Sequence, residues 1–232
     1  MMLDIFSSFD PAINSLNNIS ALSFWLLLTA SLILFTGSMW CTPSPSDLVM
    51  FDIINIMNSQ SNRTSGKHIK GFNNILVALF TMIIMINLMG LLPAVFSYSS
   101  HLLFTLTFGL PLWLTLIISA IHYDTTTWAA SLLPGGAPDW LNPFLVLIET
   151  VSIAVRPLTL SFRLAANMSA GHIVLTLIGS YAAAAVFASW SALLLLFFIQ
   201  VIYIMFEVGI CLIQAYIFCL LLSLYADDHP LK

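Results

Sequence analysis

Four charged side chains stand within two long apolar segments of this chain. They are Glu149, Arg156, Arg163 and Glu207, in a sequence of 232 residues of which only 7% are charged. A charged side chain at the centre of a lipid bilayer costs about 2.5–3.5 kcal/mol on insertion scales. Such residues therefore mark ion or proton pathways, and they face protein or water rather than lipid.

The spacing of the polar residues predicts stripes on two helices. Glu149, Arg156 and Arg163 recur every seven residues, and two helical turns bring a side chain back to within about 20° of its starting direction. Three further polar residues fall within about 40° of the same line: Ser152, Thr159 and Asn167. The last apolar segment carries a second set with the same period, flanked by Tyr203: Gln200, Glu207 and Gln214.

His172 follows Arg163 by nine residues, which places it on the opposite side of the same helix. The helix therefore has two polar faces. Arginine keeps its proton at any working pH, but a fixed guanidinium lowers the pKa of a nearby carboxyl group and blocks the passage of protons. Carboxylates and histidine can relay protons. With no metal-ligand set and no pair of nucleophile and base, the pattern indicates proton handling, with no metal site and no cofactor.

Simpler interpretations stand beside this one. Arg156 can form a structural ion pair with Glu149, whereas Arg163 has no acidic partner within a turn of its own helix. His172 can be a packing histidine. Gln200 and Gln214 can form hydrogen bonds between helices, a common use of glutamine in membranes.

The composition predicts an all-α polytopic membrane protein. The chain is 60% hydrophobic, and 7% charged residues compare with about 25% in a soluble domain. We expect one integral-membrane domain over 1–232, with about five membrane helices and one amphipathic surface helix. The surface helix and the first span (21–40) belong to residues 1–71, the next two spans to 72–121, and a long, strongly tilted hairpin to 141–225.

Loops and cysteines complete this organisation. We expect a loop over 122–143, a turn between the last two helices at 179–185, and termini on opposite sides of the membrane. The basic loop 63–70, with Arg63, Lys67, His68 and Lys70, is predicted on the cytoplasmic or matrix side. Cys41, Cys211 and Cys219 lack ligand spacing and are predicted to be small hydrophobic residues.

Three segments carry a resemblance that covers nearly the whole chain: RLAANMSAGH (163–172), NLMGLLP (87–93) and EVGICLIQAYIFCLLLSLY (207–225). They resemble ATP synthase subunit a of the mitochondrial type, the stator proton-channel subunit of the membrane sector. The resemblance implies two offset half-channels that meet near an essential arginine. A rotating c-ring presents a carboxylate to each half-channel in turn.

The resemblance also implies roles for individual residues. Arg163 matches the essential stator arginine and Asn167 the asparagine one turn later. His172 and Glu207 match a neighbouring pair in the inlet half-channel, and Glu149 matches an acid in the outlet half-channel. Gln214 matches a glutamine that faces the arginine. Arg156, Gln200, Tyr203 and Ser152 are supporting candidates, and Gly90 replaces an acid found in many bacterial relatives.

The implied function is proton translocation without catalysis by the chain itself, in the mitochondrial inner membrane, with loop 63–70 on the matrix side. The implied partners are the c-ring, other stator and peripheral-stalk membrane subunits, the lipid bilayer and protons. No nucleic acid is expected. Three alternatives remain open at this point: a self-contained ion or proton transporter or channel, a proton-pumping subunit of a respiratory complex, and a structural assembly subunit.

Overall fold

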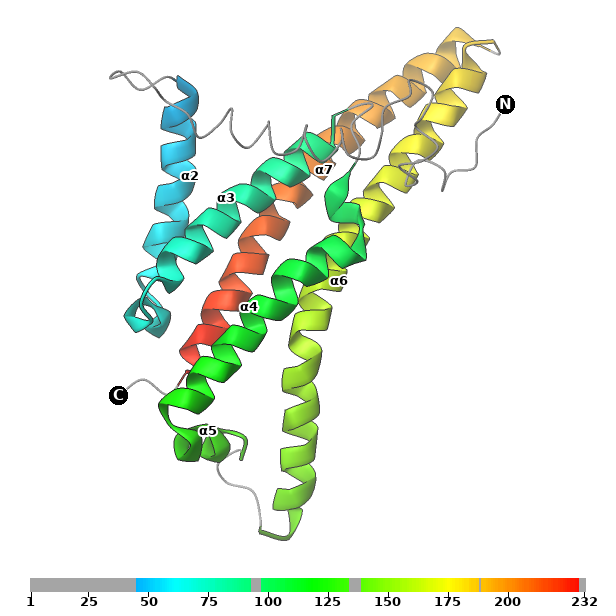
Figure 1. Cartoon of the computed structure of the whole chain (residues 1–232). Coiled ribbons are helices and arrows are strands. Elements are labelled where there is room, and N and C mark those ends of the chain that lie inside the picture. Colours follow the sequence, from blue (N-terminus) through cyan, green and yellow to red (C-terminus); the bar gives the residue numbers. More distant parts are fainter. Residues whose placement is uncertain (1–44, 93–96, 134–138, 188, 230–232) are drawn as a thin grey trace, which may run out of the picture.

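A computed structural model describes residues 45–92, 97–133, 139–187 and 189–229. Within these ranges every regular element is helical (Figure 1). The longer helices are α2 (Pro45–Ser61), α3 (Phe72–Gly90), α4 (Leu102–Tyr123), α5 (Thr125–Ser131), α6 (Asn142–Ala185) and α7 (Trp190–Asp227). Short 3₁₀ turns are η3 (Ser65–His68), η4 (Tyr98–Ser100) and η5 (Asp139–Leu141). The expected first span, 21–40, and Cys41 lie outside the described residues.

Four of these helices are long and apolar enough to cross a membrane: α3, α4, α6 and α7. Helices satisfy their own backbone hydrogen bonds, which a segment in lipid requires. The prediction of an all-α polytopic membrane protein is confirmed.

The α6/α7 hairpin is much longer than an upright span. With 44 and 38 residues, α6 and α7 measure roughly 66 and 57 Å at 1.5 Å per residue, against a hydrocarbon core of about 30 Å. Helices of this length must tilt or extend beyond the bilayer. Figure 1 shows α6 and α7 side by side along their far ends and crossing α3 and α4 nearer the middle of the molecule.

Two predicted boundaries were wrong. The expected turn at 179–185 is helical, and α6 continues to Ala185 before α7 starts at Trp190. Residues 182–185 are four consecutive alanines, and alanine has the highest helix propensity, so this stretch continues α6. The expected loop 122–143 contains α5, whose N-terminus is capped by Asp124: its carboxylate accepts hydrogen bonds from the amides of Thr126 and Thr127. The side-chain hydrogen bond from Thr126 is the main cause that lowers the pKa of Asp124.

The hydrophobic core lies between α3, α7 and the middle of α6. Leu76 and Phe80 of α3 pack with Phe218 of α7 and Leu160 of α6, all at most 5% exposed. Cys211 and Cys219 are buried free thiols, and the Cys219 Sγ lies 3.8 Å from the carbonyl oxygen of Leu76. The prediction that these two cysteines act as small hydrophobic residues is confirmed.

Helix α2 occupies the place of the predicted amphipathic surface helix. Three residues of its predicted apolar stripe are exposed, namely Leu48, Phe51 and Ile54, while Met57 is fully buried. Near its end, α2 is tied to α3 by polar side chains. Asn73 Nδ2 donates to Asn58 Oδ1 at 2.7 Å, and the Ser61 hydroxyl donates to Asn73 Oδ1. That α2 lies along the membrane surface stays a prediction.

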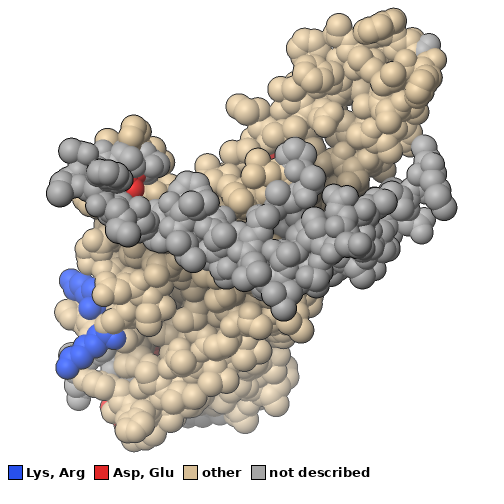
Figure 2. Space-filling view, turned by 45° about the horizontal axis from the view of Figure 1, so that its top comes forward, with Lys and Arg blue, Asp and Glu red and all other residues tan. Residues whose placement is uncertain are grey.

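The end of α7 lies against the basic loop. Asp227 accepts hydrogen bonds from both the amide and the hydroxyl of Ser65, each at 2.6 Å. The loop's Arg63, Lys67 and Lys70 are exposed. Figure 2 shows basic side chains gathered at one edge of a largely uncharged face. The C-terminal end of α7 and loop 63–70 therefore lie at the same end of the bundle.

Candidate functional site

Arg163 lies near the middle of α6 on an exposed face. Its neighbours at helical spacing, Ala166, Asn167 and Ala170, are exposed as well. Among the residues that the structure describes, no carboxylate lies within 4 Å of its guanidinium. The middle of a candidate membrane helix thus presents a permanent cation on an open face of small residues.

Asn167 and Gln214 connect α6 to α7 one turn beyond Arg163. Asn167 Nδ2 donates to Gln214 Oε1 at 3.0 Å, and Gln214 is only 4% exposed. The interpretation that Gln214 forms a hydrogen bond between helices is confirmed. This bond joins the two helices beside the arginine.

Glu207 is buried where α7 packs against α6. It is 2% exposed, and its carboxylate lies directly on Gly171: a Cβ at position 171 would be 2.4 Å from Glu207 Oε2. A side chain at position 171 would therefore displace the Glu207 carboxyl group. His172, the next residue along α6, is half-buried, and its pairing with Glu207 stays a prediction.

Two supporting candidates precede Glu207 on α7. Tyr203 is half-buried and lies one turn earlier, so its side chain is on the same side of α7 as Glu207. Gln200 is half-buried and forms no hydrogen bond through its side chain to any residue that the structure describes. Tyr203 therefore lies on the Glu207 side of α7, whereas no contact with a described residue places Gln200 at the site.

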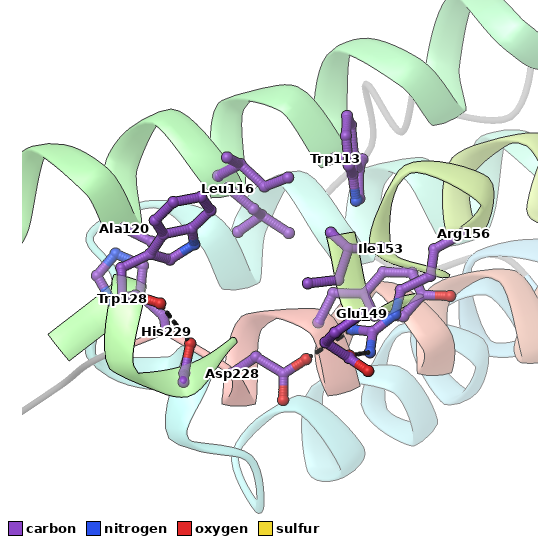
Figure 3. Close-up of a pocket in the computed structure, with 12 residues that line it drawn as sticks. Trp113, Leu116, Ala120, Trp128, Glu149, Ile153, Arg156, Asp228 and His229 are labelled. Atoms are coloured by element: carbon purple, nitrogen blue, oxygen red, sulfur yellow. Dashed lines mark hydrogen bonds and ion pairs between the residues drawn. The ribbon is translucent and has the colours of Figure 1, made fainter. Parts of the chain in front are cut away.

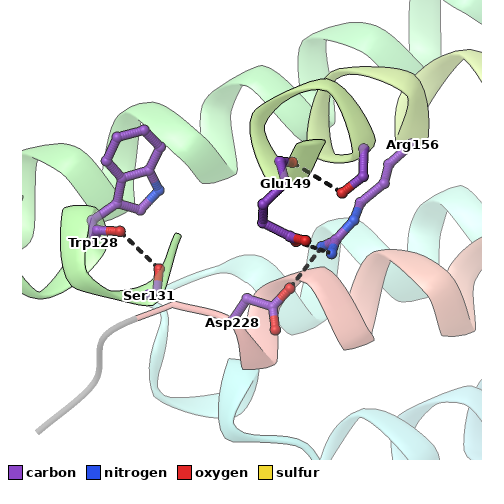
Figure 4. A network of polar contacts seen from close by, with 6 residues as sticks. Trp128, Ser131, Glu149, Arg156 and Asp228 are labelled. Carbon is purple, nitrogen blue, oxygen red and sulfur yellow. Dashed lines mark hydrogen bonds and ion pairs between the residues drawn. The ribbon is translucent and has the colours of Figure 1, made fainter. Parts of the chain in front are cut away.

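Arg156 is held within the chain, unlike Arg163. Its guanidinium lies 2.8 Å from Asp228 and 3.5 Å from Glu149, and stacks 5.3 Å from the centre of the Tyr225 ring. Figure 4 shows the three charged side chains converging from α6 and from the end of α7. The interpretation of Arg156 as an ion-pair partner of Glu149 is confirmed. Ser152 donates to the backbone carbonyl of Glu149 at 2.9 Å.

A cavity of about 210 Å³ adjoins this ion-pair cluster. Figure 3 shows Glu149, Arg156, Asp228 and His229 around it, with Trp113 and Trp128 among its aromatic walls. A cavity of this volume has room for several waters. Asp228 has 67% of its side chain exposed, so the cluster is in contact with solvent. The cavity extends from Glu149 to Asp228 and His229 at the end of the bundle.

Glu149 and His172 lie on either side of Arg163 along α6. Glu149 is 14 residues before it and His172 nine after it, or about 21 and 14 Å at 1.5 Å per residue. The two sites are too far apart for direct proton transfer. Any path between them must pass the level of the arginine.

Asp228, Tyr225 and Gly171 were not predicted as site residues. Asp228 lies 72 residues from Arg156, and no helical period connects the two. The only indication was the polar composition of the chain's last residues. Gly171 appeared in the sequence only as part of a small-residue surface.

We expect Arg156→Ala to lower the stability of the assembled protein by about 1 kcal/mol and to leave most of its proton transport. The ion pairs are partly exposed and each contributes about 0–1 kcal/mol, while the cation–π contact adds a similar amount. Thermal dissociation and proton pumping of the purified complex measure both quantities. Arg63→Ala, which removes an exposed arginine with no ion pair to a described residue, is the control. Complete loss of transport in an intact Arg156→Ala complex would contradict this supporting role.

Comparison with known proteins connects this geometry to a family. The family model described as ATP synthase A chain matches residues 19–227. ATP synthase subunit a of Artemia franciscana is 37% identical over 98% of this chain and all of its own length. The proteins of the same name from Albinaria caerulea and Locusta migratoria are 37% and 34% identical, over 99% and 98% of this chain and 100% and 99% of their own lengths. The chain belongs to the ATP synthase subunit a family.

Proposed function

We propose that this chain conducts protons through two half-channels that meet at Arg163, where they load and unload a carboxylate on a rotating c-ring. Subunit a is the proton-translocating stator subunit of the membrane sector, and the proposal assigns residues to that function. The observation that carries it is the contrast between the two intramembrane arginines. Arg156 has two carboxylate partners, and Arg163 has none among the described residues.

The partner of Arg163 comes from another subunit. An uncompensated charge in the membrane is costly, so a cation on an open helix face requires a neighbouring anion or water. Ala166 and Ala170 let a second helix approach closely. A carboxylate carried by a c-ring helix fits this face, because it can lie beside the guanidinium and give up its proton there.

Glu207 and His172 form the inlet site. The Glu207 carboxyl group is almost fully buried against Gly171, and His172 is the next residue along α6. A carboxyl group and a histidine at one helix crossing can pass a proton between them and on to a ring carboxylate. Tyr203, one turn before Glu207 on the same side of α7, is a supporting candidate at this site.

Glu149 accepts the proton on the outlet side. From there the proton leaves through the 210 Å³ cavity toward the solvent-exposed Asp228. Arg156 pairs with both carboxylates and orders them, and Ser152 donates a hydrogen bond to the backbone carbonyl of Glu149. Arg156 and Ser152 are positioning residues in this scheme, with Gln200 a further supporting candidate.

Arg163 separates the two routes. Its charge repels a proton that would cross directly from the inlet to the outlet site, and it cannot itself carry one. The Asn167–Gln214 hydrogen bond holds α6 and α7 in register at this level. Protons therefore cross the membrane only while bound to the carboxylates of the rotating ring.

The remaining assignments follow from this role. The chain holds no nucleotide and no cofactor, and catalysis takes place in other subunits of the complex. Its partners are the c-ring and the other stator and peripheral-stalk membrane subunits. We place it in the mitochondrial inner membrane, with loop 63–70 and the end of α7 facing the matrix.

The alternative is a self-contained transporter or channel lined by its own polar stripes. In that case Arg163 would face a pore inside the chain. Its position on an open face, away from Glu207 and Glu149, favours a partner subunit instead.

A cysteine at position 166 is expected to cross-link to a c-ring subunit. Ala166 lies on the open face beside Arg163, and Ala165→Cys is the matched control because Ala165 is only 6% exposed. The measurement is oxidative cross-linking in membranes, with a second cysteine on the outer helix of the c subunit. A product with Ala166→Cys and none with Ala165→Cys supports the proposal. If neither variant gives a c-subunit product in assembled complexes, the ring does not face this surface.

A further inference from the structure

Helix α7 ends on two adjacent carboxylates. Asp227 is its last residue, Asp228 follows directly, and no basic residue lies in the last turn of the helix. The C-terminus of a helix carries a partial negative charge, so cations stabilise it and carboxylates do not. Helix ends also fray readily, so the two carboxylates need partners from other segments if the last turn of α7 is to keep its place.

Each carboxylate has such a partner, and the two partners come from different segments. Asp228 forms its ion pair with Arg156 of α6 at 2.8 Å (Figure 4). Asp227 accepts hydrogen bonds from the amide and the hydroxyl of Ser65, which lies 162 positions earlier, in the loop between α2 and α3. The last turn of α7 is therefore held between loop 63–70 and α6.

Loop 63–70 also approaches this turn closely with its backbone. Ala226 of α7 is fully buried, and a Cβ at Gly66 would lie 2.9 Å from the Ala226 Cβ and 3.2 Å from the ring of Phe72. A side chain at position 66 would therefore push the loop away from the helix. The close approach keeps the amide of Ser65 within hydrogen-bond distance of Asp227.

We propose that loop 63–70 positions the outlet site through the Ser65–Asp227 hydrogen bonds. These bonds hold the last turn of α7, so that Asp228, the next residue, stays at the cavity that it shares with Glu149. Ser65 and Asp227 do not line this cavity, so they act as positioning residues. The inference rests on the proposed function of the outlet site in proton release.

The carboxylate of Asp228 lies among several charged or titratable groups. They are Arg156 and Glu149 of α6, Tyr123 at the end of α4, Tyr225 and His229 of its own segment, and the basic side chains of loop 63–70. Ser65 has no titratable group, so its replacement leaves all of them in place. A changed pH dependence in a Ser65 variant therefore reports the position of Asp228 and not a lost charge.

Ser65→Ala in the intact ATP synthase tests this inference. We expect ATP synthesis per assembled complex to fall about threefold, because the lost hydrogen bonds go to a charged group but are exposed to solvent. Relative to wild type, the loss should be larger at acidic than at alkaline matrix-side pH, where returning protons compete with release. It should not depend on the pH of the inlet side. Ser65→Thr, which keeps the hydroxyl, should restore the rate. Thr64→Val is the matched control, since the Thr64 hydroxyl bonds to the Ser61 carbonyl and not to α7.

Asp227→Ala removes the acceptor of the same hydrogen bonds, and it also serves if Ser65→Ala fails to assemble. Two substitutions that remove one interaction are not additive, so the double variant should be about as slow as Asp227→Ala alone. Losses that multiply in the double variant, or a loss that is the same at every matrix-side pH, would overturn the proposal.

Glu149→Gln in the same assay separates this inference from the proposed function. A slow Glu149→Gln complex beside a Ser65→Ala complex with the wild-type rate would overturn only the positioning role of the loop. A Glu149→Gln complex with the wild-type rate would overturn the outlet assignment and the inference with it.

Discussion

Replacing Arg163 with alanine is expected to abolish ATP-driven proton pumping while the complex still assembles. The variant removes the one intramembrane cation that has no carboxylate partner among the described residues of the chain. Without it, an arriving ring carboxylate keeps its proton, and protons can pass between the two half-channels. Loss of a single preorganised charge costs about 10²–10³ in rate, so pumping should fall to background.

The measurement is acidification of membrane vesicles on addition of ATP, normalised to assembled complex. Because Arg163 is exposed and unpaired within the described chain, its removal breaks no internal ion pair and should spare assembly. Arg156→Ala is the matched control on the same helix, two turns earlier, and should keep most of its pumping. Coupled pumping above half of the wild-type rate in Arg163→Ala would remove this residue from the centre of the mechanism.

Gly171→Ala is expected to slow proton translocation between about tenfold and a hundredfold. A Cβ at this position would lie 2.4 and 2.5 Å from the two oxygens of the Glu207 carboxyl group, closer than any real contact. The carboxyl group must therefore move by about 1 Å, a displacement that can reduce rates about a hundredfold in a preorganised site. The two helices can also separate, which would loosen the Asn167–Gln214 bond.

Gly179→Ala provides a matched control on the same helix. An added Cβ there meets no atom within 4 Å, so this variant gains helix propensity without a clash. Rates of ATP synthesis in energised vesicles compare the two. Glu207→Gln, which keeps the shape but not the charge, should likewise slow translocation without preventing assembly. Equal rates for Gly171→Ala and Gly179→Ala would show that the Glu207 position does not limit proton transfer.

The local sequence was sufficient to predict most of the fold. Long apolar runs in a bilayer must be helical, because no other open structure satisfies its backbone there. The same logic identified the polar stripes, since period and residue type are local properties of a helix. The prediction went wrong at 179–185, where a glycine and a serine suggested a turn but four alanines continue α6.

The contacts between helices could not be predicted in this way. The pairing of Arg156 with Asp228 joins residues 72 positions apart, and the contact of Gly171 with Glu207 joins residues 36 apart. Each of these contacts depends on the position of α7 relative to α6 along their axes. That register is set by side-chain shapes along the whole interface, such as Cys211 against Met168.

By itself, the sequence determined which residues of this protein carry charge in the membrane, their spacing along two helices, and the family they resemble. The tertiary structure decided which of these charges are satisfied. The spacing alone did not distinguish Arg156 from Arg163. In the packed structure Arg156 forms ion pairs with two carboxylates, whereas Arg163 forms none with a described residue. The physical reason is that a helical period fixes directions around one axis, whereas the environment of a side chain depends on the neighbouring helices that the fold brings to it.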